Sequence, residues 1–363
     1  MDMKKLKVGV IGLGEVAQII HLPILESLSE CYEIVAICDI SPRLVQWAGS
    51  RYGVHQQYTD ALELVKQSDL DAVFILNSNE YHTTCAIAAI KQKKHVFIEK
   101  PMTMTQQEAD AIIEARDEYG VKVMVGYMRR YAPAFTQAAQ DVRDMGRIQY
   151  AVIRGIIGMN HFFTNQTSTV HRFTDIPSEA AIERKTIHQR LMKQAIGEVP
   201  QEIYNAYSLL LGLGSHDISA MRELIGVPNR VVSAVQWQGG SCMAATFEYD
   251  GFYATYETGL DQNRRFDAHI EVFGSTKQLK IQYNTPYIRH LPTTLHVGET
   301  VGEAYEERVH RPTFKDPYTI EMEIFHESIT QDKSLKTTPE DYKQDLTIFK
   351  MMVDQMLITY KPQ

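Results

Sequence analysis

The chain has 363 residues, of which 44% are hydrophobic and 23% charged, and its formal net charge at pH 7 is −8. This composition is typical of a globular protein with a full core, and the length suggests two domains of about 150 residues each. The negative charge, with no basic stripe to offset it, argues against a nucleic-acid or anionic-membrane surface, and no apolar run is long enough to span a bilayer.

The first thirty residues predict a strand, a tight turn and a helix. Residues 6–11 form a short apolar run with β-branched side chains, which indicates a buried strand. The next residues, GLGEVA at 12–17, open an apolar helix through Leu28. In such a turn Gly12 permits the tight bend, Gly14 lets the backbone approach a pyrophosphate, and Ala17 keeps the helix close to the strand. Free N–H groups at the helix start attract anions, so the turn predicts a dinucleotide site.

An acidic residue follows the second predicted strand. That strand, residues 31–37, leads to Asp39, at about the spacing from the glycines at which a carboxylate binds the ribose hydroxyls of a dinucleotide. The charge of Asp39 would repel the 2′-phosphate of NADP, which favours NAD. Arg43 lies nearby on the next helix and partly offsets that charge, so NADP stays possible.

The rest of the first half alternates helices and strands. We expect helices at residues 42–51, capped by Ser41 and ended near Gly53, and at 61–66, 81–90 and 105–119. Strands are expected at residues 71–76, 95–98 and 121–125. This alternation predicts a parallel sheet with helices on both faces, whose ligands bind beyond the carboxyl ends of the strands.

Three loops fall at those strand ends, namely NSNEYH at 77–82, EKP at 99–101 and GYMRRY at 126–131. The first loop fits a polar cap for the next helix as well as it fits a ligand contact. Lys100 is either a solvated loop residue or a donor to a substrate hydroxyl beside a nicotinamide. In the second case partial burial would lower its pKa toward a useful range.

Together these strings resemble the Gfo/Idh/MocA family of sugar and polyol oxidoreductases. The start reads GVIGLGEVA, NSNEYH stands for that family's T-P-N-x-x-H, and GYMRRYAP stands for its G-F-N-R-R-F-x-P, although Met128 replaces an asparagine. EKP, GRI at 146–148 and GSHDI at 214–218 extend the resemblance along the whole chain, with gaps. It implies an α/β Rossmann domain that binds NAD or NADP, expected at 1–127, and an α+β domain with an open antiparallel sheet, expected at 128–363.

The second half has the pattern expected for that second domain. We expect helices at 133–145, 177–196 and 201–225, a strand at 148–157, and a loop at 160–174. Strands follow at 231–237, 242–249, 252–258, 268–273 and 277–282, with weaker ones to about 310 and closing helices at 317–329 and 339–360. Asp250-Gly251 is a strong hairpin signal. Residues 160–200 are interpreted as an insertion that covers the substrate cleft or only buttresses the helix behind it.

His216 is singled out by the resemblance, which implies that it lines the pocket with Lys100. In the family pattern D-x-G-x-H-D a carboxylate precedes the histidine by four positions, on the same helical face. Here that position is Gly212. Three explanations stay open: that Asp217 or a carboxylate of the insertion region (Glu179, Glu183 or Glu202) substitutes, that Lys100 takes a larger share, or that the chemistry differs.

The resemblance also implies the other roles. Lys100 would orient or polarise the reacting oxygen and His216 would be the acid/base, since the pKa of imidazole suits proton exchange. The substrate pocket would include Tyr127, Arg130 and Asp217. The residues expected at the cofactor, with Asn79 and His82 on the nicotinamide side, are Gly12, Gly14, Glu15, Val16, Ala17, Asp39, Arg43, Asn77, Asn79, His82, Glu99 and Lys100.

We therefore expect a nicotinamide-dependent oxidoreductase of a sugar, polyol or related carbonyl compound. The alternatives are an enzyme that retains its cofactor and assists elimination or glycoside cleavage, and a dinucleotide-binding regulator without activity. No metal is expected, because no histidine falls in a ligand-spacing pattern. The four cysteines lack such spacing and indicate a reducing cytoplasm. Members of this family usually associate through the open sheet, which implies a homodimer or homotetramer.

Overall fold

The computed structural model describes residues 4–360, which form two compact units. The first unit contains the described residues up to Gly126 together with Ser168–Gly197 and Glu321–Lys343. The second contains Tyr127–Thr167, Glu198–Ile320 and the described residues from Gln344 onward. The units thus differ from the expected ranges 1–127 and 128–363 in that the chain returns twice to the first unit.

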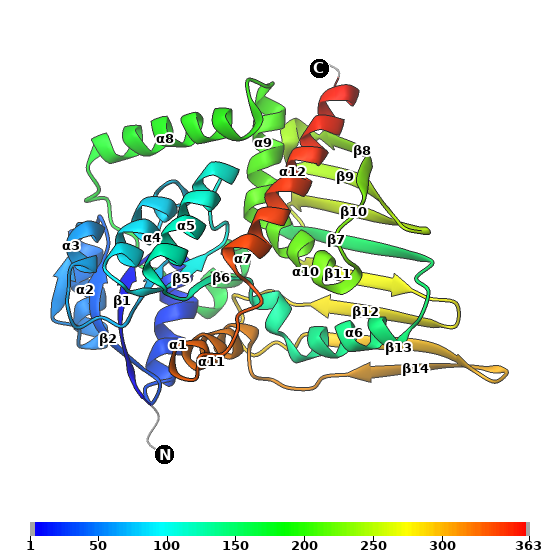
Figure 1. Cartoon of the computed structure of the whole chain (residues 1–363), viewed down its shortest axis with the longest axis horizontal. Coiled ribbons are helices and arrows are strands. Elements are labelled where there is room, and N and C mark those ends of the chain that lie inside the picture. The colour runs from blue at the N-terminus through cyan, green and yellow to red at the C-terminus, as the bar shows by residue number, and fades with distance from the viewer. Residues whose placement is uncertain (1–3, 361–363) are drawn as a thin grey trace. The chain divides into compact units, whose positions relative to one another are not determined.

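The first unit is built on a parallel sheet of six strands in the order β3-β2-β1-β4-β5-β6 (Figure 1). This confirms the predicted Rossmann architecture. The short polar strand β3 was not predicted, because three residues reading QQY carry no hydrophobic pattern. The strands are β1 (Leu6–Ile11), β2 (Tyr32–Cys38), β3 (Gln56–Tyr58), β4 (Ala72–Ile75), β5 (His95–Glu99) and β6 (Val123–Gly126).

The helices of this unit begin and end close to the predicted residues. Ser41 caps α2 by accepting a hydrogen bond from the Leu44 N–H at 3.2 Å, and Gly53 ends the helix with φ 69°. The predicted first helix starts with a π-helical turn, η1. The helices are η1 (Ala17–His21), α1 (Leu22–Ser27), α2 (Pro42–Tyr52), α3 (Ala61–Val65), η2 (Asn79–Tyr81), α4 (His82–Lys91), α5 (Gln106–Tyr119) and α8 (Ser178–Ile196).

A late helix completes the core of the first unit. From Glu321 on, α11 (Pro317–Thr330) belongs to this unit, and its Phe325 ring lies 5.7 Å from each of the rings of Phe74 and Phe97. The Tyr32 hydroxyl donates to the carbonyl of Met322 at 2.6 Å. The sheet therefore buries one end of its core against a segment that lies more than two hundred positions further along the chain.

The second unit is built on a mixed sheet of eight strands in the order β14-β13-β12-β11-β7-β10-β9-β8. The predicted hairpins are present, and Gly251, with φ 85°, lies in the turn between the antiparallel strands β9 and β10. β7 comes from before the long helices and pairs in parallel with β10, so the sheet is not purely antiparallel. The strands are β7 (Tyr150–Gly158), β8 (Arg230–Trp237), β9 (Cys242–Tyr249), β10 (Phe252–Asp261), β11 (Phe266–Phe273), β12 (Lys277–Tyr283), β13 (Thr294–Val301) and β14 (Ala304–His310).

Helices of the second unit lie along one face of this sheet (Figure 1). Buried and more exposed residues alternate along β9 and β7, as in a sheet with one face in the core. One short helix, α7, replaces part of the loop predicted at 160–174. The helices are η3 (Met128–Tyr131), α6 (Pro133–Asp144), α7 (His161–Thr167), α9 (Gln201–Leu209), η4 (Leu210–Gly214), α10 (Ser215–Ile225), η5 (Gln238–Gly240) and most of α12 (Pro339–Thr359). Among residues 4–360, no helix has the length and apolar character needed to cross a membrane.

Candidate active site

The predicted ligand loops of the first unit begin at the carboxyl ends of neighbouring strands, which lie in register with one another. The last residue of β1 pairs with the last residues of β2 and β4, and the last residue of β4 pairs with Ile98 of β5. Gly12, Asp39, Asn77 and Lys100 follow these positions within one or two residues. Because the strands are parallel, these four residues gather beyond the same edge of the sheet, where open α/β sheets bind ligands.

The glycine turn leaves the backbone at Gly14 exposed, with free space beside it, at this edge of the sheet. Gly12 has φ +94°, and a Cβ added there would lie 2.4 Å from the backbone nitrogen of Asn77, so only glycine fits. At Gly14, which is exposed, an added Cβ would meet nothing within 4 Å. Within residues 4–360 the buried Oδ1 of Asn77 has no hydrogen-bond partner. Open backbone beside an unsatisfied acceptor fits the nucleotide predicted from the sequence.

Asp39 is held in place by the backbone around it. One carboxylate oxygen accepts from the Leu13 N–H at 2.8 Å, and the other accepts from the Ser41 N–H at 3.0 Å. Each oxygen has further acceptor capacity, so the carboxylate can also receive ribose hydroxyls. The glycine turn and Asp39 are therefore joined before any ligand binds.

Glu99 positions the loop that carries Lys100. It is only 8% exposed, accepts from His21 Nε2 at 2.7 Å and accepts from the Lys100 backbone N–H at 3.1 Å. Burial raises the pKa of Glu99, but the hydrogen bond and charge of His21, together with Lys100, outweigh burial and lower it. Lys100 itself is half-buried and follows β5 directly. Glu99 is thus an ionised, buried residue that holds the backbone of the Lys100 loop in place.

His82 is a buried link between two loops and does not face a ligand. It is fully buried, and its ring nitrogens lie 2.8 Å from the carbonyl oxygen of Pro101 and 3.0 Å from that of Asn77. Burial lowers the pKa of His82, although both hydrogen bonds oppose this. Its expected place on the nicotinamide side does not fit this burial, whereas Asn79, at the start of η2, stays half-buried.

His216 lies at the second position of α10, directly after the π-helical turn η4, and is 8% exposed. Gly212 lies within that turn, and a Cβ added there would meet nothing within 4 Å. A π-helical turn takes up an extra residue, so the spacing of four between these positions does not have its ordinary meaning here. The position that holds a carboxylate in the family pattern is thus open space beside a helix turn.

Asp217 is not a substrate-pocket residue in this structure. It is 1% exposed, forms an ion pair with Arg129, and accepts from the Tyr256 hydroxyl at 3.4 Å. Burial raises the pKa of Asp217, while Arg129 and Tyr256 oppose the rise. Gly155 makes room for it, since an added Cβ would lie 2.2 Å from its Oδ2. Its carboxylate is bonded to Arg129 and Tyr256 in the interior of the second unit, so it does not replace the carboxylate that is missing at position 212.

Tyr127 and Arg130 are also interior residues. The Tyr127 hydroxyl donates to Asp345 at 2.5 Å, and Asp345 also accepts from Arg222 Nε at 2.5 Å. Arg130 Nε donates to Glu223 at 2.5 Å. Both predicted pocket residues are less than 4% exposed, because they tie η3 to α10 and α12 through hydrogen bonds to Glu223 and Asp345. The expectation that they shape the floor of a pocket is corrected accordingly.

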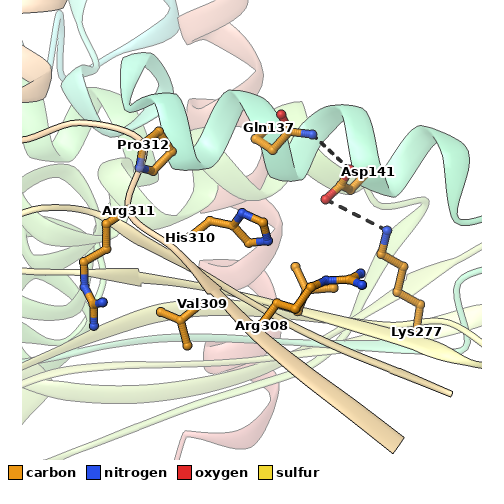
Figure 2. A pocket seen from close by; sticks show the side chains of 9 residues that line it. Gln137, Asp141, Lys277, Arg308, Val309, His310, Arg311 and Pro312 are labelled. Atoms are coloured by element: carbon orange, nitrogen blue, oxygen red, sulfur yellow. Dashed lines mark hydrogen bonds and ion pairs between the residues drawn. The ribbon is translucent and has the colours of Figure 1, made fainter. Parts of the chain in front are cut away.

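A separate hollow of about 700 Å³ lies in the second unit between α6 and strands β12–β14 (Figure 2). Several of its charges are paired: Lys277 lies 4.0 Å from Asp141, and Arg308 donates to Glu299 at 2.7 Å. None of the residues predicted for the site lines it. The hollow therefore adds nothing to the candidate active site.

One segment at the cofactor corner was not assigned to it from the sequence. Residues 171–175, which we call the strap, contact the first helix and α2 within the first unit. Beyond the strap, His188 of α8 lies 2.9 Å from Glu80 in the NSNEYH loop. The expected insertion thus packs on the cofactor corner. Its polar, aromatic composition had indicated only a loop.

Comparisons with known proteins agree with this architecture. Residues 6–127 match the oxidoreductase family with an NAD-binding Rossmann fold. Inositol 2-dehydrogenase of Salmonella typhimurium is 35% identical over 145 residues, which are 39% of this chain and 43% of that protein. The chain therefore spans less than half the length of that relative. Myo-inositol 2-dehydrogenase of Thermotoga maritima is 26% identical over 353 residues, 94% of each chain.

Solved structures share the fold over nearly the whole chain. Levoglucosan dehydrogenase in complex with NADH and levoglucosan has a TM-score of 0.75 at 19% identity, with 98% of each chain covered. Scyllo-inositol dehydrogenase from Lactobacillus casei has a TM-score of 0.72 at 20% identity, covering 99% of this chain and 98% of the other. The folds of both units are therefore known from solved structures.

Proposed function

We propose that this chain, whose residues 6–127 match the Gfo/Idh/MocA oxidoreductase family, transfers a hydride between NAD and a hydroxyl-bearing carbon of a polyol or sugar. One observation carries the proposal: the glycine turn, Asp39, Asn77 and Lys100 begin at the same level of one parallel sheet. Residues of the kinds that bind a dinucleotide and polarise a hydroxyl are thereby brought to one edge.

The chain's own residues divide the work of binding. The backbone at Gly12 and Gly14 receives the pyrophosphate, and Asp39 receives the adenosine ribose. NAD, when bound, supplies the acceptor for the hydride that leaves the substrate carbon. Asn77 Oδ1, which lacks a hydrogen-bond partner within residues 4–360, is an acceptor for a donor group of the ligand.

Lys100 and His216 carry the proton chemistry in this proposal. The Lys100 ammonium donates to the reacting oxygen and stabilises negative charge that develops on it. His216 takes the proton from the substrate hydroxyl during oxidation and returns it during reduction, since an imidazole exchanges protons near neutral pH. Glu99 and His82 act through the loop: they fix its backbone from inside the unit.

The substrate class follows from the relatives. Inositol dehydrogenases are among the proteins that match this chain, which supports a cyclic polyol or sugar substrate. The exposed face of the second sheet supports association of like chains, because it carries the large side chains Tyr150, Val232, Val235, Trp237, Tyr253, Tyr305 and Val309. Four free cysteines support a cytoplasmic location.

The test is a panel of inositols, sugars, sugar acids and sugar phosphates, each with NAD and with NADP, followed by absorbance of the reduced cofactor. Lys100→Met should lower turnover of the best substrate by about 1,000-fold, because a charge-stabilising donor is lost, while the affinity for NAD changes less than about threefold. Lys91→Met, at an exposed lysine of α4, is the matched control and should leave both unchanged.

The remaining outcomes separate the alternatives. Unchanged turnover in Lys100→Met removes Lys100 from the mechanism. Turnover of a substrate without net formation of NADH indicates a retained cofactor that assists elimination or glycoside cleavage. Tight NAD binding with no turnover on any substrate supports a regulator, a second candidate that the vacated carboxylate position at Gly212 favours.

A further inference from the structure

The strap, residues 171–175, bridges the two helices that flank the cofactor corner. The backbone of His171 is bonded to the Gln18 side chain in both directions, at 2.8 Å and 3.0 Å. Its ring lies 4.3 Å from the ring of Trp47 on α2. Arg172 forms an ion pair with Glu15, the residue after Gly14. The strap is therefore attached both to the segment that follows the glycine turn and to α2, which follows Asp39.

The end of the strap occupies the start of α2. One carboxylate oxygen of Asp175 accepts from the Ser41 hydroxyl at 2.6 Å, and the other accepts from the Arg43 backbone N–H at 2.9 Å. The Arg43 guanidinium lies 4.4 Å from the centre of the Phe173 ring. A hydroxyl, a helix N–H and a guanidinium, all within four residues of Asp39, are thus engaged by two side chains of the strap.

These three groups are the ones a phosphate would use. The 2′-phosphate of NADP lies on the ribose that an acidic residue such as Asp39 binds, and sites for it offer an arginine near that position. Hydroxyl groups, N–H groups at a helix start and guanidinium groups are good partners for a phosphate dianion. A carboxylate held on two of them has the same charge sign as that phosphate and satisfies the same donors.

We propose that Asp175 fills the place of the 2′-phosphate and makes the strap the element that selects NAD over NADP. The inference rests on the proposed function, because it needs a dinucleotide at this corner. It also bears on Arg43: the guanidinium lies on Phe173 and the backbone N–H is bonded to Asp175, so both groups already have partners in the strap. The hydrogen bond from Ser41 lowers the pKa of Asp175, which keeps this carboxylate ionised at neutral pH.

The experiment is calorimetric binding of NAD and NADP, without substrate, to the unaltered chain and to Asp175→Ala and Asp175→Asn. Removal of the charge should lower the ratio of Kd for NADP to Kd for NAD by about tenfold or more, since a carboxylate next to a phosphate dianion is removed. Asp175→Asn should give a smaller shift, because its amide still occupies the space. Adenosine 2′,5′-bisphosphate, which lacks the nicotinamide, should follow NADP.

The same substitutions are repeated in an Asp39→Ser background, where the first repelling charge is gone. Asp332→Ala is the matched control: Asp332 is an exposed carboxylate of the first unit that is paired with Lys122, so its loss changes net charge equally without touching the corner. Thermal unfolding of every variant checks that it is folded, and Asp175→Asn carries the test if Asp175→Ala is not.

Three results are decisive. A fall of the ratio in either background supports the strap as the selector. An unchanged ratio in both backgrounds, or an equal loss of both affinities, overturns the inference and makes the strap only a brace between two helices. Failure of the unaltered chain to bind NAD or NADP contradicts the proposed function itself, and the strap then has no ligand to select.

Discussion

The two units use their polar residues in opposite ways. In the first unit Asp39, after a strand end, is fixed by backbone N–H groups, the backbone at Gly14 is left open, and the buried Oδ1 of Asn77 has no hydrogen-bond partner within residues 4–360. In the second unit the string at 127–131 turns inward, so that Tyr127 and Arg129 bond to the buried carboxylates of Asp345 and Asp217, and Arg130 bonds to the half-buried Glu223. A polar residue after a strand end therefore faces a ligand only where the backbone keeps neighbouring side chains away.

This difference has an energetic basis. Glycines beside a strand end remove side chains that would otherwise cover the backbone, which costs some chain entropy and leaves room for a ligand. Arginines beside buried carboxylates lose hydration, and the pair compensates for that loss only while both partners are present. Substitution of the glycines beside the strand ends should change the affinity for a ligand. Substitution of the arginines beside buried carboxylates should change the free energy of unfolding.

The largest expected effect comes from breaking the buried pair of the second unit. Arg129→Met leaves Asp217 as an unpaired buried charge, so the free energy of unfolding should fall by about 3–5 kcal/mol. Arg230→Met, which removes an exposed pair with Glu248, is the control and should cost at most about 1 kcal/mol. Urea unfolding followed by circular dichroism measures both. A stable Arg129→Met variant with lost turnover would instead place Arg129 at the substrate.

A smaller effect is expected where the second unit is open. Gly212→Asp meets no atom within 4 Å of the new Cβ, so the carboxylate can be accommodated one turn before His216. A nearby negative charge favours the imidazolium, which raises the pKa of His216. The acidic limb of kcat/KM for polyol oxidation should therefore move to higher pH. Gly212→Asn has nearly the same shape without the charge and should leave the limb in place.

An unmoved limb in Gly212→Asp would have a clear meaning. The π-helical turn η4 would then have rotated position 212 away from His216, so that the missing carboxylate was never a partner of this histidine. The comparison of the two units would become sharper, because position 212 would then also face away from the residue that we propose as the acid/base.

Local signals predicted much of the fold. Ser41 and Gly53 mark the two ends of α2, and Asp250-Gly251 marks the hairpin of β9 and β10, because caps and turns depend on neighbours in the chain. Contacts between distant segments were not predictable in this way. The packing of Phe325 on Phe74 and the strap on α2 join residues more than a hundred positions apart, with no local pattern that names the partner.

The site divides along the same line. The grouping of Gly12, Gly14 and Asp39 could be predicted because a short motif and a spacing define their backbone geometry, and their role at a cofactor stays a prediction. Tyr127, Arg130 and Asp217 were assigned to a pocket by their place in family-like strings, but which side of a helix they face depends on partners such as Asp345 and Gly155. Residue type and order alone do not carry that information.

The smallest expected effect concerns a surface pair in the first unit. The hydrogen bond from Arg116 Nη1 to Glu340, at 2.7 Å, is part of the contact that lowers the pKa of Glu340 to about 2. A lowered folded-state pKa contributes stability that is full above the unfolded value of about 4.3 and is lost as the pH falls toward 2. Because Glu340 is 47% exposed, Glu340→Gln should lower the free energy of unfolding by at most about 1 kcal/mol at pH 7.

At pH 3 the difference between Glu340→Gln and the unaltered chain should be smaller than at pH 7, as measured by urea unfolding at both pH values. Gln106→Ala, on the same helix as Arg116, tests whether docking of α12 on α5 and not the charge is responsible, since Gln106 bonds to the Lys343 carbonyl and does not titrate. A loss in Glu340→Gln as large as that in Arg129→Met, and constant with pH, would contradict the distinction between screened and buried pairs. A loss of at most about 1 kcal/mol that fades with falling pH supports it, because protonation removes the contribution of a carboxylate with a lowered pKa and solvent screening keeps that contribution small.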